Sequence, residues 1–121
     1  MAKEKQFENK IKRFLESNGI YGLGTPKQKI KIKPIGYWEK RWGGSVYVKR
    51  GLPDLHVVVN KINIDVEVKA EDGEPSDLQE KMIEQIKEAG GIALILYPEN
   101  FEDFKKLIYK LKEGGGNERG D

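Results

Sequence analysis

Asp54, Glu67 and Lys69 are the residues of this chain whose types and spacing could do chemistry. They belong to two strand-like runs on either side of Asn60-Lys61, a pair that can form a two-residue hairpin turn. In that register Asp54 lies opposite Glu67, and with a four-residue loop the two become diagonal neighbours. In both registers Lys69 follows Glu67 on the same face, about 7 Å along the strand. A slip of one residue is excluded because it would bury these charges.

Two adjacent carboxylates repel, which raises the pKa of one of them, and a divalent cation removes that cost. Magnesium is typically held by one or two carboxylates together with waters and substrate phosphates. A lysine beside such a site can orient or deprotonate an attacking water and balance phosphate charge. The alternative is an exposed cross-strand face on which Glu67 and Lys69 are merely solvated.

Hydrophobic periodicity predicts a single small mixed α/β domain over residues 1–113, followed by a disordered tail at 114–121. On the polar hairpin face, His56 is interpreted as a strand residue paired with Asp65. The other expected elements are helices at 3–18, 76–89 and 100–112 and strands at 29–33, 55–59, 62–69 and 92–97, the last of them central and buried. Residues 34–44 are expected to be irregular, and 45–49 to form another short strand. Leu78, Met82, Ile83 and Ile86 are expected to face inward from the second helix.

Composition excludes several classes of protein. The chain has no cysteine and one histidine, so disulfide scaffolds, thiolate zinc sites and multi-histidine metal sites are ruled out. The charged N-terminus shows no signal peptide, and no apolar run reaches the roughly 20 residues that a membrane span needs. We therefore expect no membrane association and a cytoplasmic, intracellular location.

The ordered set Gly51-Leu52-Pro53-Asp54, Glu67-Val68-Lys69 and a following helix that carries Gln79 resembles the PD-(D/E)XK nuclease superfamily. Within it, the chain is most similar to the virus-type replication-repair nuclease family, VRR-NUC, over roughly residues 7–110. This resemblance implies a mixed sheet flanked by helices in the order αβββαβα. It also implies a DNA endonuclease that depends on Mg²⁺ or Mn²⁺.

The resemblance also implies roles for individual residues. Asp54 and Glu67 match the metal ligands, with the Val68 backbone carbonyl completing the protein's share, and Lys69 matches the residue that positions the water. Glu8 matches a helix glutamate that serves as an outer or second-metal ligand, although a plain surface salt bridge suits its helical neighbours equally. Gln79 matches a glutamine near the site. It is also the N3 residue of a Ser76-Asp77-Leu78-Gln79 capping box, in which it would bond back to the cap residue instead.

Residues 25–50 form a basic block that carries eight basic residues against Glu39 alone, a net charge of +7. Cations suit phosphates and aromatic rings suit unstacked bases, so this block is a candidate DNA-binding region. The alternatives are a solvated lysine-rich surface, and tryptophans that pack in the core or in a dimer interface. The candidate DNA-binding residues are Lys40, Arg41, Lys49, Arg50, Trp38 and Trp42.

Standalone VRR-NUC proteins are similar to Holliday-junction resolvases and are often encoded by phages, so the resemblance implies a bacterial or phage-infected host cell. The resemblance therefore implies branched DNA, such as a four-way junction, as the substrate and a homodimer as the assembly. Two alternatives remain open at this point. One is a general or sequence-specific nuclease, and the other is a DNA-binding module that has lost catalysis.

Overall fold

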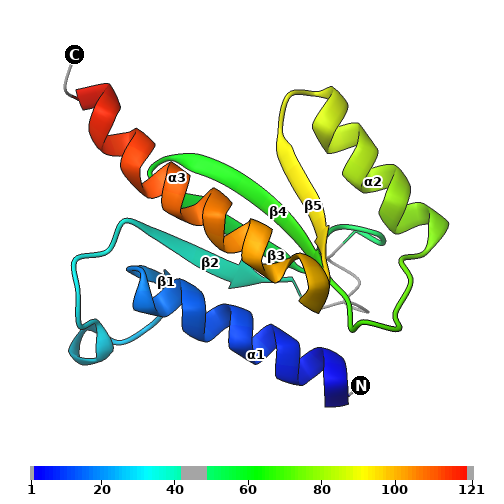
Figure 1. Ribbon diagram of the computed structural model, residues 1–121, viewed down its shortest axis with the longest axis horizontal. Coiled ribbons are helices and arrows are strands. Elements are labelled where there is room, and N and C mark those ends of the chain that lie inside the picture. The colour runs from blue at the N-terminus through cyan, green and yellow to red at the C-terminus, as the bar shows by residue number, and fades with distance from the viewer. Residues whose placement is uncertain (1, 42–48, 120–121) are drawn as a thin grey trace.

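The computed structural model describes residues 2–41 and 49–119, with side chains up to residue 114. The chain forms a small mixed α/β domain with one five-stranded sheet and three helices (Figure 1). The helices are α1 (Ala2–Ser17), α2 (Asp77–Glu88) and α3 (Phe101–Arg119), and the 3₁₀ turns are η1 (Lys27–Lys29) and η2 (Pro98–Asn100). The strands are β1 (Ile20–Gly22), β2 (Gly36–Lys40), β3 (Leu55–Val59), β4 (Ile62–Val68) and β5 (Ile92–Leu96).

The sheet has the strand order β1-β2-β3-β4-β5, with parallel pairs at both edges and antiparallel pairs in the middle. The β3–β4 hairpin has the predicted two-residue register, with Leu55 opposite Val66 and His56 opposite Asp65. Asn60 and Lys61 make the turn with φ values of 47° and 75°. A tight turn of the I′ type needs positive φ at both central residues, which asparagine tolerates well. The register that places the carboxylates is therefore confirmed.

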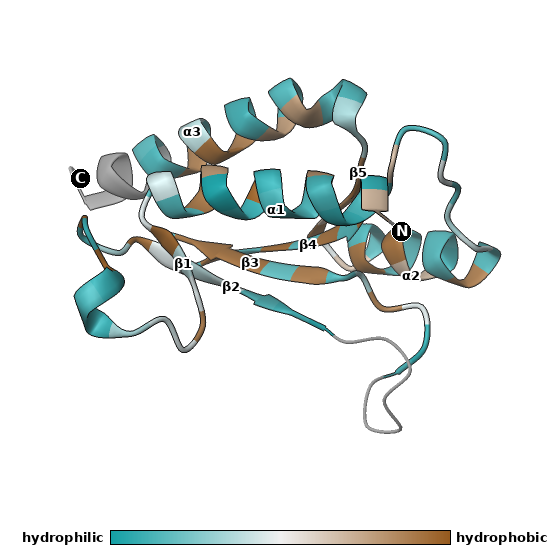
Figure 2. Cartoon of the chain, turned by 90° about the horizontal axis from the view of Figure 1, so that it is seen from below, coloured by the Kyte–Doolittle hydropathy of each residue, from teal (hydrophilic) through white to brown (hydrophobic). Residues whose placement is uncertain are grey.

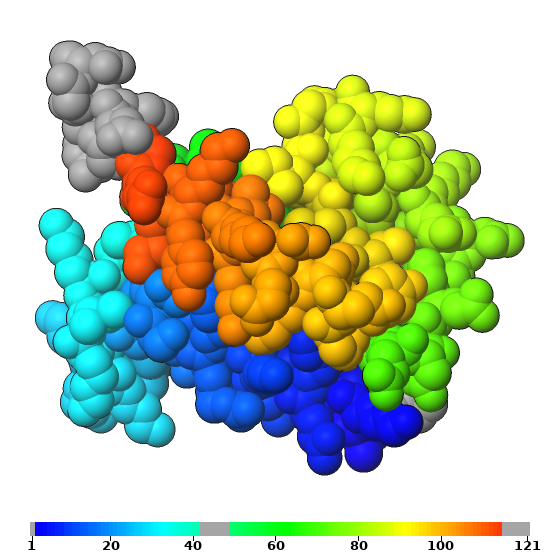
Figure 3. Space-filling view, viewed as in Figure 1, coloured from blue at the N-terminus to red at the C-terminus, as the bar shows by residue number. Residues whose placement is uncertain are grey.

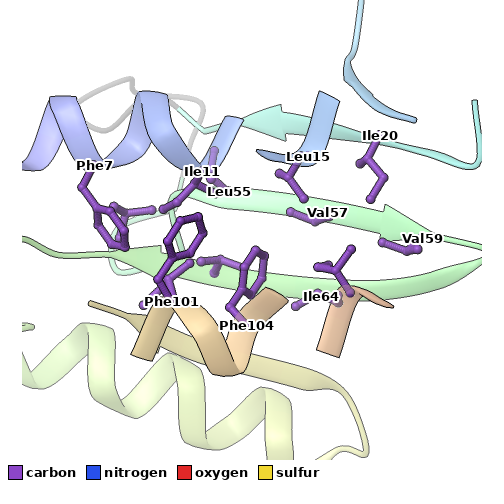
Figure 4. Close-up of a cluster of buried hydrophobic side chains, with 14 residues drawn as sticks. Phe7, Ile11, Leu15, Ile20, Leu55, Val57, Val59, Ile64, Phe101 and Phe104 are labelled. Carbon is purple, nitrogen blue, oxygen red and sulfur yellow. The ribbon is translucent and has the colours of Figure 1, made fainter. Parts of the chain in front are cut away.

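Helices α1 and α3 lie side by side on one face of the sheet (Figure 2). Apolar side chains from α1 and α3 meet the inward face of β3 and β4 there, and Phe7 packs edge-on against Phe101 with ring centroids 5.5 Å apart (Figure 4). The predicted first helix is confirmed to within one residue at each end. The core that it covers comprises Phe7, Ile11, Leu15, Ile20, Leu55, Val57, Val59, Ile64, Val66, Val68, Leu96, Phe101, Phe104 and Ile108.

Two features of the other helices differ from the predictions. Ile83 of α2 is buried as expected, but Leu78 is 40% exposed because it lies against Gly51 instead of the sheet. Helix α3 continues to Arg119, beyond its expected end at residue 112. Each of the glycines at 114–116 costs about 1 kcal/mol of helix propensity, but glycine does not forbid helical φ and ψ. The tail from 114 onward is therefore helical here to Arg119, and the domain boundary at 113 stays a prediction.

Residues 29–33 are not the expected strand, although lysine and isoleucine alternate there. The hydroxyl of Tyr21 accepts hydrogen bonds from the backbone N–H groups of Lys31 and Ile32, both at 3.0 Å. Because a side chain satisfies these donors, no partner strand is needed. The predicted strand at 45–49 lies mostly outside the described residues, and Lys49 is not in a strand.

Strand β2 occupies a stretch that was expected to be irregular. Gly36 begins it and has no room for a side chain, since a Cβ atom would lie 1.8 Å from the Val58 carbonyl oxygen. The apolar run 92–97 is a strand as predicted, but β5 is at the edge of the sheet rather than at its centre. It is apolar throughout because the core covers one of its faces and α2 packs against the other. No helix in the described part of the chain is long and apolar enough to cross a membrane.

Candidate functional site

Asp54 and Glu67 lie at the same end of the central hairpin, Asp54 just before β3 and Glu67 near the end of β4. Asp54 Oδ2 accepts a hydrogen bond from the Val68 backbone N–H at 3.1 Å, which ties the two strands together at this point. Glu67 alternates with the core residues Val66 and Val68, so its side chain leaves the opposite face of the sheet, yet it is only 1% exposed. The structure therefore brings the two predicted carboxylates together, with Glu67 buried and Asp54 half-buried.

One oxygen of Glu67 is fully engaged and the other is not. Glu67 Oε2 accepts a hydrogen bond from Gln79 Nε2 at 2.8 Å and lies 3.4 Å from Lys69 Nζ. Glu67 Oε1 is buried and has no hydrogen-bond partner among the described residues. Burial, with the Asp54 carboxylate as the next cause, raises the pKa of Glu67 to about 7.

Gln79 has both of the roles that its position in the sequence suggested. Its Oε1 accepts from the Ser76 backbone N–H at 2.8 Å, while Ser76 Oγ accepts from the Gln79 backbone N–H at 3.1 Å, which completes the capping box of α2. The nitrogen of the same amide, Nε2, donates to Glu67 Oε2. Because the cap fixes the amide oxygen, it also fixes the direction in which Gln79 donates.

The donor set fits a hard divalent cation. Burial raises the pKa of Asp54 as well, although the Val68 N–H and the Lys69 ammonium oppose that effect. Two carboxylates that resist ionisation, one of them with an orphaned buried oxygen, form a site that a cation would stabilise. Among the described residues no three histidine or acidic side chains are grouped closely enough to hold a metal by themselves. The remaining ligands would therefore be backbone oxygen, water or substrate. The Val68 carbonyl as one of them stays a prediction.

Glu8 forms ion pairs with lysines, as the salt-bridge alternative expected, but it is buried and not at the surface. Its role as an outer or second-metal ligand stays a prediction. Glu8 is 3% exposed, and its carboxylate lies 2.7 Å from Lys40 Nζ, 2.8 Å from Lys12 Nζ and 3.5 Å from Lys5 Nζ. Burial acts to raise the pKa of Glu8, but Lys12 and Lys40 outweigh it and hold the pKa below its usual value. Its negative charge also acts on Asp54, so this ion cluster adjoins the carboxylate pair.

Arg41 fixes the segment that carries Asp54. Its backbone N–H donates to the Asp54 carbonyl at 2.7 Å, and its Nη1 donates to the Pro53 carbonyl at 2.9 Å. The same Nη1 lies 3.0 Å from Asp65 Oδ1, and Nη2 lies 3.4 Å from His56 Nδ1. His56 Nδ1 is itself 3.2 Å from Asp65 Oδ1, as the predicted cross-strand pairing requires. The guanidinium of Arg41 therefore makes its contacts within the protein, to Pro53, His56 and Asp65.

The other candidate DNA-binding residues differ in how exposed they are and in what they contact. Trp38 is half-buried and packs against the core cluster, with Lys12 Nζ 4.9 Å from its ring centroid, so the core alternative holds for it. Lys40 is bound to Glu8. Lys49 and Arg50 are exposed, and Trp42 lies outside the described residues.

Sequence reasoning did not assign the positioning role of Arg41 or the part of Lys12 in the Glu8 cluster. Lys12 was detectable, because i,i+4 pairs on a helix face one another. Arg41 was not, because it reaches Asp65 across the sheet from the end of β2, a strand that the pattern did not reveal. Searches against family models, curated proteins and solved structures found no match for this chain.

Proposed function

We propose that this protein is a metal-dependent DNA endonuclease of the PD-(D/E)XK type, related to the VRR-NUC family. The observation that carries the proposal is half-buried Asp54 beside buried Glu67. Lys69 and Gln79 contact one Glu67 oxygen, and the other oxygen has no hydrogen-bond partner among the described residues. A buried carboxylate oxygen without a hydrogen-bond partner calls for an ion, a water or a ligand beside it. The order α–four strands–α–β–α has one strand more before α2 than the family pattern that the motifs suggest.

The chain's own residues have distinct parts in phosphodiester hydrolysis. A divalent cation held by Asp54 and Glu67 would supply positive charge against the phosphoryl oxygens. Gln79 holds Glu67 Oε2, which keeps Oε1 directed at the site. Lys69 Nζ lies 3.4 Å from the same carboxylate, where it balances phosphate charge and orients the attacking water. The water oxygen bonds to phosphorus as one ester P–O bond breaks, and the leaving oxygen takes up a proton.

The non-catalytic DNA-binding module is the rival from another class. It predicts binding without turnover, and it gives no reason for Lys69 and Gln79 to converge on Glu67. The finer part of the proposal, branched DNA as substrate and a homodimer as assembly, is supported by the family resemblance of the motifs. Two cuts in a four-way junction need two sites in matching orientation, which a two-fold dimer supplies.

Cleavage of matched linear, flap and four-way DNA substrates tests the proposal. We expect cleavage in Mg²⁺ or Mn²⁺, little in Ca²⁺ and none in excess chelator, because oxygen ligands select hard cations and the looser geometry of calcium misplaces the water. Light scattering at micromolar concentration measures the molar mass and so shows whether the protein is a monomer or a homodimer. Undiminished cleavage in chelator would refute the metal site. A monomer that cuts all three substrates equally well would contradict the branched-DNA preference and the homodimer, and the general nuclease would be the remaining alternative.

Arg41→Ala separates positioning from DNA binding. If Arg41 holds the Pro53–Asp54 segment, we expect kcat to fall about 10- to 100-fold while KM changes little, because a shift of about 1 Å in a catalytic group has effects of that size. Arg41→Lys should recover only part of the loss, since one ammonium cannot reach Pro53, Asp65 and His56 together. If Arg41 binds DNA instead, KM will rise, kcat will hold, and the salt dependence of binding will weaken. Arg13→Ala is the matched control, because Arg13 is exposed on α1 and is not among the candidate DNA-binding residues.

A further inference from the structure

Residues 23–35, which we call the basic arm, connect β1 to β2 and carry four exposed lysines: Lys27, Lys29, Lys31 and Lys33. No acidic residue occurs anywhere from 17 to 38. Within the described part of the chain, none of the four lysines forms an ion pair. The arm projects at one edge of the molecule (cyan in Figure 3) and is hydrophilic over most of its length (Figure 2). It is therefore a concentrated positive charge that the protein itself leaves uncompensated.

The arm is held in place by specific hydrogen bonds. Buried Tyr21 receives the two backbone N–H groups of Lys31 and Ile32 at its hydroxyl. The Ile35 N–H donates to the Gly19 carbonyl at 2.9 Å, which closes the base of the arm. Between these points η1 adds bonds of its own, such as Ile30 N–H to the Lys27 carbonyl at 3.1 Å. Because the backbone is already ordered, binding would cost little conformational entropy there.

The arm lies on the same face of the sheet as the carboxylate site. Tyr21 pairs with Tyr37, and Tyr37 pairs with Val58, which points away from the core that its neighbours Val57 and Val59 fill. Glu67 leaves this same outer face. Three strand spacings across the sheet and about four residues along it separate Tyr21 from Glu67, which amounts to roughly 20 Å. That is about six phosphates along one strand of a duplex.

We propose that the basic arm is a polyanion-binding site for the sugar–phosphate backbone of the duplex DNA whose scissile strand enters the carboxylate site. This inference rests on the proposed function for its choice of DNA. It also moves the binding role from Lys40 and Arg41, which are bound to Glu8 and Asp65, to lysines that form no ion pair with any described residue. Leu23 and Ile32 are 65% and 47% exposed on the arm. Exposed apolar side chains beside lysines also suit an anionic membrane, which is the alternative partner. The common face with Glu67 favours DNA.

The test is the salt dependence of DNA binding for a variant in which the four arm lysines are replaced by glutamine. Anisotropy of a labelled 20-base-pair duplex is measured in chelator, so that nothing is cleaved. Each lost phosphate contact lowers the log–log slope by about 0.9, so we expect the slope to fall by about 3 to 4 and the affinity at 0.1 M salt by at least about 100-fold. The matched control has the same charge change at four exposed lysines elsewhere: Lys61, Lys81, Lys106 and Lys110.

The experiment distinguishes a wrong assignment of DNA binding to the basic arm from a wrong assignment of nuclease activity to the protein. An unchanged slope in the arm variant, or an equal fall in the control, would overturn the inference. So would arm-dependent binding of phosphatidylserine vesicles with DNA binding unaltered, which would assign the arm to membranes. Hydrolysis of bis(p-nitrophenyl) phosphate, which is too small to reach the arm, should be unchanged in the arm variant, and its loss would contradict a remote site. If the wild type hydrolyses nothing but shows the arm-dependent slope, the nuclease proposal fails and the arm still binds DNA.

Discussion

Asp54→Asn, Glu67→Gln and Lys69→Ala should each lower the rate of DNA cleavage by at least about 100-fold while the protein stays folded. The two carboxyl substitutions remove the anionic oxygens that would hold a cation, and Lys69→Ala removes the cation beside Glu67. Losses of 100- to 10,000-fold are typical when a group that acts on protons or on developing charge is deleted. The fold should survive because the core that Figure 4 shows lies on the opposite face of the sheet.

Circular dichroism and plasmid cleavage in Mg²⁺, measured on the same preparations, check this expectation. Glu80→Gln is the matched control for the carboxyl-to-amide change, because Glu80 is exposed and adjoins Gln79. Lys106→Ala serves in the same way for Lys69→Ala. Wild-type cleavage by the Lys69→Ala protein would remove lysine from the mechanism. Wild-type cleavage by Glu67→Gln would remove the carboxylate site altogether.

Local patterns were enough to predict the part of the site that a hairpin builds. The alternation of apolar and charged residues on both sides of Asn60-Lys61 predicted which residues share a face, because any one-residue slip would bury charge. It left a two-residue and a four-residue loop open, and the structure has the two-residue turn. Two of the alternatives that the sequence left open turned out to be compatible with each other. The amide oxygen of Gln79 accepts a hydrogen bond in the capping box, and the amide nitrogen donates one to Glu67. A capping motif and a role at the site need not compete for the same side chain.

The parts that escaped prediction depend on contacts between distant segments. Lys29 to Lys33 alternates as a strand does, but Tyr21, ten residues away, takes up its backbone donors. Gly36 weakens the strand signal of β2, and only the close approach of the Val58 carbonyl explains why glycine stands there. Once β2 was missed, the path of Arg41 to Asp65 could not be seen. Charge alone marked Lys40 and Arg41 as DNA-binding residues, whereas the structure pairs both with buried or half-buried carboxylates.

Without metal, the protein should lose stability as the pH rises from 5 to 8. The pKa of Glu67 is raised to about 7 in the folded state, whereas an unfolded glutamate titrates near 4.5. Between these values the folded state binds more protons than the unfolded state, so the free energy of unfolding falls with rising pH and levels off above about pH 7. The upper limit of the loss is about 3 kcal/mol, or roughly 12 °C in Tm for a domain of this length. The raised pKa of Asp54 acts in the same direction. Glu8, whose pKa is lowered, changes stability only at more acidic pH.

Thermal unfolding in chelator at several pH values between 5 and 8 measures this effect. Glu67→Gln should remove most of the slope and should unfold at a higher temperature than the wild type at pH 8, because it no longer buries a negative charge beside Asp54. Glu80→Gln should keep the wild-type slope. Mg²⁺ at pH 8 should restore the Tm of the wild type but not that of Glu67→Gln, since a ligand that binds only the folded state stabilises it. If the wild type and Glu67→Gln show the same flat profile, Glu67 is not the strained carboxylate that the site requires, and the case for a cation between Asp54 and Glu67 is lost.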